Sequence, residues 1–150
     1  MTFHFRYKLV KYPDGGLGKV PAVPVTLIGP SGAFLKVIAL VDSGADYSVI
    51  SKEVGDLLGF DLTEGKTATT YGIGGTMKTL HKQIMMKFGR NHEIYSLSVP
   101  VKILLDSVDF EIPPLIGRAG FFEQFEIRFD ERKERIAFKK VAGDPTAVRR

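Results

Sequence analysis

The chain has 150 residues, of which 44% are hydrophobic and 25% charged, and its formal net charge is +4 at pH 7. This balance is ordinary for one globular domain with one core. The absence of cysteine excludes disulfides, thiolate catalysis and cysteine-ligated metals, and His4, His81 and His92 lack the spacing of metal ligands. We therefore expect neither a metal nor another cofactor.

The N-terminus shows no charged segment followed by an apolar one, and no apolar run reaches the length of a membrane span. The resulting expectation is a cytoplasmic protein without a membrane partner. The positive charges gather near the C-terminus in "ERKER", "FKK" and "VRR" without aromatic residues between them. That pattern favours solvated surface over a nucleic-acid site, which is kept as the weakest alternative.

The N-terminal half is expected to consist mainly of strands. Polar and apolar residues alternate from Phe3 to Leu9, which predicts a strand with one buried face, and "YPDGGLGKVP" then predicts a loop. Strands are predicted around Val23–Leu27 and over Phe34–Val41, joined by the turn "GPSG" into a hairpin. A short helix capped by Ser51 follows through "KEVGDLL" and ends at Gly59.

The second half of the chain is also expected to consist mainly of strands. The segments "KTATTYG" and "TMKTLHKQIMMKF" flank "GIGG" and predict a long hairpin with a glycine-rich tip, followed by the strand "HEIYSLSVPVKILL". A short helix is predicted from about Arg118 to Phe125, and a last hairpin pairs "FEIRFD" with "ERIAFKK". About eight strands and two short helices without βαβ alternation predict an all-β closed or sandwich-like domain.

Three motifs occur in a telling order: "LVDSGAD" at Leu40–Asp46, "YGIGG" at Tyr71–Gly75 and "PLIGR" at Pro114–Arg118. Together they resemble the aspartic proteases, and most closely the retropepsin-like, single-lobe proteins of cells. The resemblance implies a closed β-barrel of the acid protease type with one or two short helices. We expect this domain to span residues 1–141, with a flexible basic tail over residues 142–150.

The resemblance also implies roles for particular residues. The catalytic loop would consist of Asp42, Ser43 and Gly44. Substrate would be bound by residues of this loop and of a flap hairpin, namely Ala45, Asp46, Tyr71, Gly72, Ile73, Gly74 and Gly75. The loop would be supported from behind by Leu115, Ile116, Gly117 and Arg118, with Arg118 paired to Asp46.

Peptide hydrolysis of this type requires two carboxylates that share a proton, and the chain offers one convincing candidate. Asp106 lacks the following glycine, and Asp14 lacks both the hydroxyl and the preceding apolar strand. The second carboxylate is therefore expected to be Asp42 of another copy in a two-fold homodimer that cleaves a peptide or protein substrate.

Each motif also has a plainer interpretation. Asp-Ser-Gly occurs in ordinary turns, and "GIGG" can be a simple hairpin turn or an imitation of a phosphate-binding loop, although no Lys-Ser/Thr follows it. A catalytically silent module that binds proteins or peptides on the same fold remains the main alternative to an aspartic endopeptidase.

Overall fold

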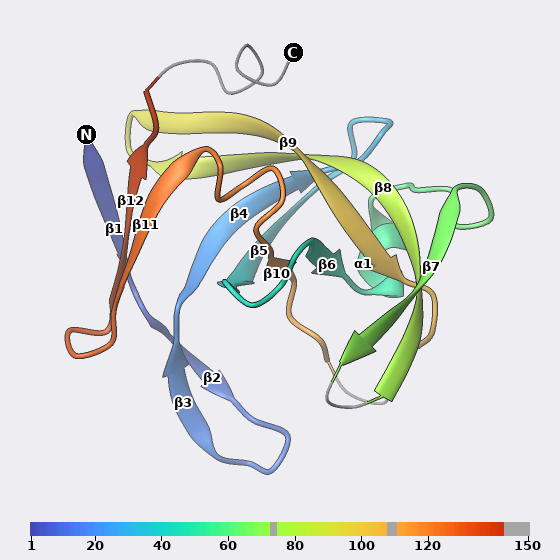
Figure 1. Cartoon of the computed structure of the whole chain (residues 1–150), viewed down its shortest axis with the longest axis horizontal. Helices are drawn as coiled ribbons and strands as arrows, with labels where there is room; N and C mark the ends of the chain where they lie inside the picture. Colours follow the sequence, from blue (N-terminus) through green and yellow to red (C-terminus); the bar gives the residue numbers. More distant parts are fainter. Residues whose placement is uncertain (73–74, 108–110, 143–150) are drawn as a thin grey trace.

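A computed structural model describes residues 1–72, 75–107 and 111–142. Its strands and its helix follow one another along the chain as shown in Figure 1. The elements are β1 (Thr2–Arg6), β2 (Lys8–Lys11), β3 (Leu17–Val20), β4 (Ala22–Ile28), β5 (Phe34–Val41), β6 (Ser48–Ile50), α1 (Lys52–Leu57), β7 (Lys66–Gly72), β8 (Gly75–Arg90), β9 (Glu93–Leu104), β10 (Leu115–Ile116), β11 (Phe125–Asp130) and β12 (Arg135–Lys140).

The largest sheet closes on itself. Its strands follow the order β4-β5-β10-β6-β9-β8-β7, and an additional pairing of β4 with β8 joins the first strand to the sixth. The long strand β8 makes this closure possible because its first half pairs with β7 and its second half with β4, while β9 runs along most of its length. The expected all-β, single-lobe fold is confirmed, and the pairings form a closed ring.

A second sheet, of order β1-β12-β11, lies beside the barrel (Figure 1). Its inner face is joined to the barrel by a cluster of phenylalanine rings, in which Phe88 of β8 lies 4.7 Å from Phe138 of β12 between ring centroids. Phe3 and Phe5 of β1 also pack against Phe88, at 5.5 and 5.7 Å. Edge-to-face aromatic pairs of this kind add to the stabilisation from burial alone.

The predicted helix after Ser51 is confirmed, and the Ser51 hydroxyl caps it by accepting a hydrogen bond from the Val54 N–H at 3.2 Å. The predicted helix at Arg118–Phe125 is wrong, because residues 118–124 form consecutive turns. Gly120 has a φ of +75°, outside the helical region, and it approaches β9 so closely that a Cβ atom would lie 2.9 Å from Pro100.

The strand predicted from Phe3 to Leu9 is divided at Tyr7, whose N–H bonds to the Glu134 carbonyl. Beyond it, β2 and β3 form a separate two-stranded hairpin, so the predicted loop at residues 12–21 is wrong in its second half. The residues of both strands are half-buried or exposed, and none is fully buried, so the sequence shows no buried face that would identify them as strands. The tail proposed for residues 142–150 lies outside the described residues except for Ala142.

Candidate active site

The Asp42 loop begins where β5 leaves the barrel core. Val41 is buried, and the Asp42 N–H donates to the Ile116 carbonyl at 2.9 Å. The Ala45 N–H then donates to the Asp42 carbonyl at 3.2 Å, which closes a tight turn. The backbone of Asp42 is thus held by β10 on one side and by its own loop on the other.

The Asp42 carboxylate is half-buried, and its Oδ1 accepts the Gly44 N–H at 2.9 Å. A Cβ atom on Gly44 would lie 3.3 Å from this oxygen, which is tighter than an ordinary contact. The Ser43 side chain is exposed, and its hydroxyl makes no hydrogen bond within the part of the chain that is described. One carboxylate oxygen is therefore oriented by the loop, while the second carboxylate oxygen and the Ser43 hydroxyl are left for groups outside it.

Arg118 lies against the second acid of the loop. Its guanidinium forms an ion pair with Asp46, as the resemblance implies. The backbones of the two segments also join, because the Arg118 and Ala119 N–H groups donate to the Ala45 and Asp46 carbonyls, both at 2.9 Å. Since both charged side chains are more than half exposed, the ion pair contributes little to stability, and the backbone bonds hold the segments together.

Gly117 is required by a close approach of two backbones. A Cβ atom at this position would lie 2.2 Å from the carbonyl carbon of Tyr47, inside any possible contact distance. The approach also lets the buried Ser48 hydroxyl accept the Gly117 N–H at 3.1 Å. Sequence reasoning missed Ser48, because the register between the two segments is not visible in the amino-acid pattern.

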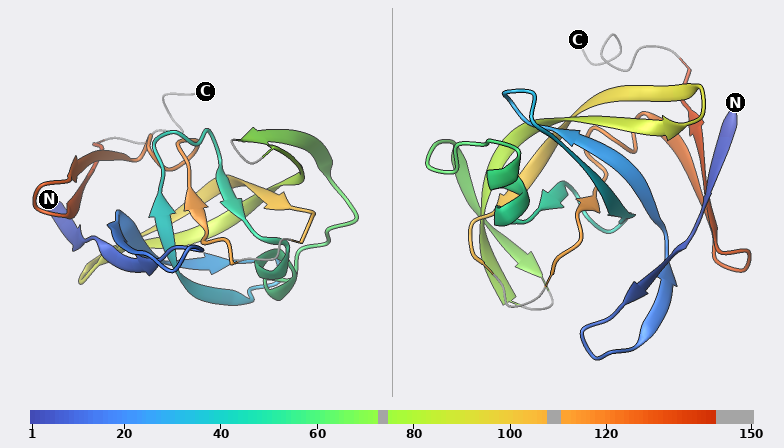
Figure 2. Two further views of the ribbon diagram at one scale, coloured as in Figure 1. Left: turned by 90° about the horizontal axis from the view of Figure 1, so that it is seen from below. Right: turned by 180° about the vertical axis from the view of Figure 1, so that it is seen from behind.

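The predicted flap corresponds to the β7–β8 hairpin. Tyr71 pairs with Thr76 and Gly72 with Gly75, and the Tyr71 side chain is 79% exposed. Ile73 and Gly74, predicted to bind substrate, lie outside the described residues. In the left view of Figure 2 the end of β7 and the loop after β5 lie on the same, upper side of the molecule.

A polar cluster behind the Asp42 loop was not expected from the sequence. The Tyr47 ring packs edge-on against His81 with 5.5 Å between ring centroids, and the Lys102 ammonium lies 4.9 Å from the centre of the Tyr47 ring. Burial lowers the pKa of His81, and the positive charges of Lys102 and Lys66 lower it further. Tyr47 lies just before β6, His81 on β8 and Lys102 on β9, so no local sequence signal could have joined them.

The two other acids considered for the second carboxylate lie elsewhere. Asp14 sits in the turn between β2 and β3, where its Oδ1 accepts the Gly16 N–H at 2.8 Å. Asp106 follows β9 and accepts the Lys78 N–H at 3.3 Å. In the described part of the chain, no three His, Asp or Glu residues are grouped so as to hold a metal ion. That part also contains no helix both long and apolar enough to cross a bilayer.

Comparison with known families agrees with this arrangement. The sequence model of a family described as aspartyl protease matches residues 23–107, from β4 through β9 and into the segment after it. The match covers more than half of the chain and includes the Asp42 loop. The chain belongs to this aspartyl protease family. The matched range excludes β1, β2, β3, β10, β11 and β12, so the family model alone does not account for the second sheet.

Among solved structures, one shares the fold of this member of the aspartyl protease family. A retropepsin-like aspartic protease from Rickettsia conorii is 20% identical, with a TM-score of 0.57, and the similarity covers 92% of this chain and 91% of that chain. EIAV protease in complex with the inhibitor HBY-793 is 19% identical with a TM-score of 0.45, covering 73% of this chain and 88% of that chain. No curated protein matches the sequence.

Proposed function

We propose that the protein is an aspartic endopeptidase whose active site forms between two copies of the chain, with Asp42 of each copy providing one carboxylate. The observation that carries this proposal is the Asp42 loop, which presents a single oriented carboxylate at the end of a barrel strand. Asp46, the other acid of the loop, forms an ion pair with Arg118 and is therefore not a candidate for the second carboxylate.

The chemistry requires two carboxylates, and the second chain is proposed because one chain offers a single convincing candidate. Two carboxylates about 3 Å apart repel by about 5 kcal/mol at an effective dielectric near 20, which separates their titrations by about 4 pKa units. One proton is then retained between them over a wide pH range. The ionised Asp42 acts as general base on a water molecule, and the protonated Asp42 donates its proton to the carbonyl oxygen of the scissile peptide.

The surrounding residues have supporting roles in this proposal. Ser43, whose hydroxyl has no partner among the described residues, would hydrogen-bond across the two-fold axis and fix the two loops. Gly44 would leave room for an extended substrate backbone, and the β7–β8 hairpin would close over it and exclude water. Ala45, Asp46 and the flap residues Tyr71, Gly72 and Gly75 would bind the substrate backbone.

The first test replaces Asp42 by Asn, which keeps the shape of the side chain and removes its charge. We expect cleavage of an unstructured protein such as casein to fall by at least about 10³-fold between pH 3 and 7, because no general base remains. Asp14→Asn and Asp106→Asn are matched controls that should retain the activity of the wild type.

Two results would contradict the proposal. Retained activity of Asp42→Asn would remove Asp42 from the mechanism, and loss of activity in Asp106→Asn would place the second carboxylate within one chain. If the wild type stays monomeric at micromolar concentration and cleaves nothing from pH 3 to 8, the protein is instead a silent peptide-binding module on the protease fold.

A further inference from the structure

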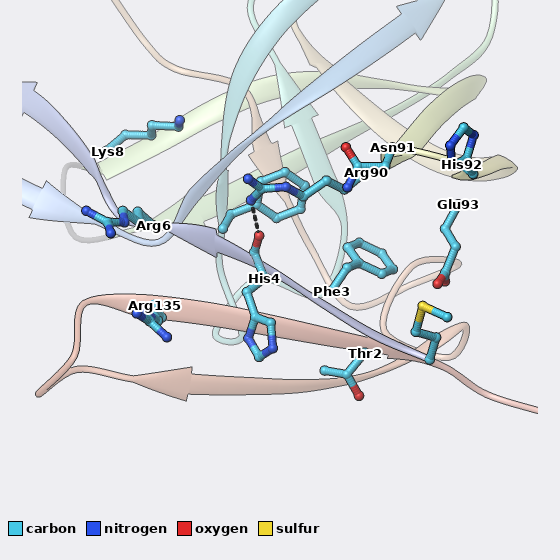
Figure 3. A pocket seen from close by; sticks show the side chains of 12 residues that line it. Thr2, Phe3, His4, Arg6, Lys8, Arg90, Asn91, His92, Glu93 and Arg135 are labelled. Carbon is cyan, nitrogen blue, oxygen red and sulfur yellow. Dashed lines mark hydrogen bonds between the residues drawn. The ribbon is translucent and has the colours of Figure 1, made fainter.

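A groove of about 750 Å³ lies far from the Asp42 loop in the fold, between β1 and the turn that joins β8 to β9 (Figure 3). One wall is β1 with the start of β2, and the other is the turn around Asn91. Figure 3 shows that basic side chains from both walls gather around it. The charged residues that line it are Arg6, Lys8, Arg90, Arg135 and Glu93.

The charge of this groove is strongly unbalanced. Four permanent cations face one carboxylate, and the carboxylate of Glu93 accepts a hydrogen bond from the Tyr95 hydroxyl at 3.0 Å. Three acids lie near Tyr7, between Arg6 and Lys8, and each has a partner of its own. Glu131 interacts with the Tyr7 hydroxyl, Glu134 forms an ion pair with Lys19 at 2.9 Å, and Asp130 accepts the Lys133 N–H. Within the described ranges, none of the side chains of Arg6, Lys8 and Arg135 forms an ion pair.

Two of these cations are placed directly opposite each other. Arg6 of β1 and Arg135 of β12 are cross-strand partners, and their side chains share the exposed face of the sheet. Asp130 is the cross-strand partner of Arg135 on the other side, but no ion pair joins the two within 4.0 Å. Like charges opposite each other destabilise a sheet. An anionic group that contacts both arginines would offset this repulsion.

Arg90 crosses the groove and fixes its shape. Its guanidinium donates to the His4 carbonyl and lies 5.5 Å from the centre of the Phe5 ring. A guanidinium carries five N–H donors in a fixed fork, so further donors remain for a carboxylate after this bond. The contact also shows that the His4 carbonyl points away from β12, into the groove.

The edge of β1 that faces the groove is unpaired apart from the His4 carbonyl, which accepts from Arg90. Among the described residues β1 pairs in its sheet with β12 alone, and the Tyr7 N–H bonds toward that side, to Glu134. Backbone groups alternate in direction along a strand, so those of Thr2, His4 and Arg6 point to the open edge. An open edge can accept an added strand from another chain.

We propose that this groove, defined by Arg6, Lys8, Arg90 and Arg135, is a docking site for an extended acidic peptide segment of a partner protein. The segment lies in the groove beside the edge of β1, next to the contact of Arg90 with the His4 carbonyl, and places carboxylates on the basic side chains. Nucleic acid fits less well, because Phe3 and Phe5 of β1 are buried and offer no ring on which a base could stack. The site is independent of catalysis by Asp42.

The test measures binding of fluorescein-labelled octaglutamate by fluorescence anisotropy at 50 mM NaCl, with octaserine as the uncharged control. The full chain carrying Asp42→Asn is used so that the probe cannot be cut. We expect saturable binding of octaglutamate alone. Raising NaCl to 200 mM should weaken it severalfold, because exposed ion pairs are screened.

The Arg6→Gln/Lys8→Gln variant should bind octaglutamate about fivefold or more weakly, since each exposed ion pair contributes modestly. Its melting temperature should not fall, because the charge opposite Arg135 is removed. Lys36→Gln/Lys66→Gln is the matched control: it loses the same charge from exposed positions on β5 and β7, and it should bind as before.

Three outcomes would overturn the proposal. Equal weakening in both variants would mean that net charge alone attracts the peptide. Tighter binding of octauridine than of octaglutamate would indicate a nucleic-acid surface. A change in the sedimentation coefficient on removing Arg6 and Lys8 would indicate that a second copy of the chain covers the groove.

Discussion

His81 connects pH to stability through its contacts with two residues near the Asp42 loop. Burial and the neighbouring Lys102 and Lys66 lower its pKa, and its ring is fixed against Tyr47. Lys102 also approaches Thr70 of β7, with 3.4 Å between Nζ and Oγ1. The added charge of a protonated His81 would therefore act on groups that contact both the Asp42 loop and the flap hairpin.

Because folding lowers the pKa of His81, the unfolded chain takes up a proton more readily than the folded one below the ordinary value of about 6.5. The free energy of unfolding should therefore fall as the pH is lowered through that value toward the folded pKa. We expect urea unfolding, followed by circular dichroism at pH 7.5 and 5, to show a smaller loss for His81→Gln than for the wild type. Lys102→Gln should also reduce the loss, since it removes a neighbouring cation. Identical losses in all three proteins would contradict this cause.

Among the elements outside the region matched by the family model, β1 has the most roles. It is short, yet Phe3 and Phe5 enter the aromatic cluster that joins the second sheet to the barrel. The same strand presents its open edge to the basic groove. We infer that residues 1–141 form one domain, because its core cannot be completed without β1.

Phe3→Ala tests this role of β1. We expect it to lower the free energy of unfolding by about 3–5 kcal/mol, because the side chain is 7% exposed and its removal leaves a cavity among five other aromatic rings. Leu9→Ala on β2 is the control: Leu9 is 63% exposed, and its removal should cost no more than about 0.5 kcal/mol in urea unfolding. If Phe3→Ala lowers the free energy of unfolding by less than 1 kcal/mol, β1 is not part of the core of the domain.

At the scale of the whole molecule, the positive net charge opposes the association of two chains. Each chain carries a formal +4, so the proposed homodimer brings like-charged bodies together. We expect sedimentation equilibrium to show severalfold tighter self-association at 200 mM than at 20 mM NaCl, because salt screens this repulsion. Cleavage activity should rise with association. Weaker association at higher salt would mean that opposite charges hold the interface.

The sequence predicted the elements that have a buried face and missed contacts between distant segments. The apolar run over Phe34–Val41 predicted β5 with its observed bounds, and its end at Asp42 located the loop. The β2–β3 hairpin was missed because its strands bury too little to leave an alternating pattern. The turns at residues 118–124 were taken for a helix, since the close approach of Gly120 to β9 is a tertiary contact.

The same limit applies to the candidate site. The three motifs located the loop, the flap and the support, since each is continuous in sequence. The contact of Ser48 with Gly117 and the cluster of Tyr47, His81 and Lys102 depend on strand register, which local patterns do not encode. The roles of the individual site residues stay predictions.

The pairing of β1 with β12 also bears on synthesis of the protein. Thr2 lies opposite Lys139, so β1 finds its partner only after the residues between them have been synthesised. The Asp42 loop likewise awaits the Ile116 carbonyl, translated much later. Pairings so distant in sequence make folding slow. The Asp42 site would therefore not be assembled on a nascent chain, and β1 would be open to chaperones until β12 has been synthesised.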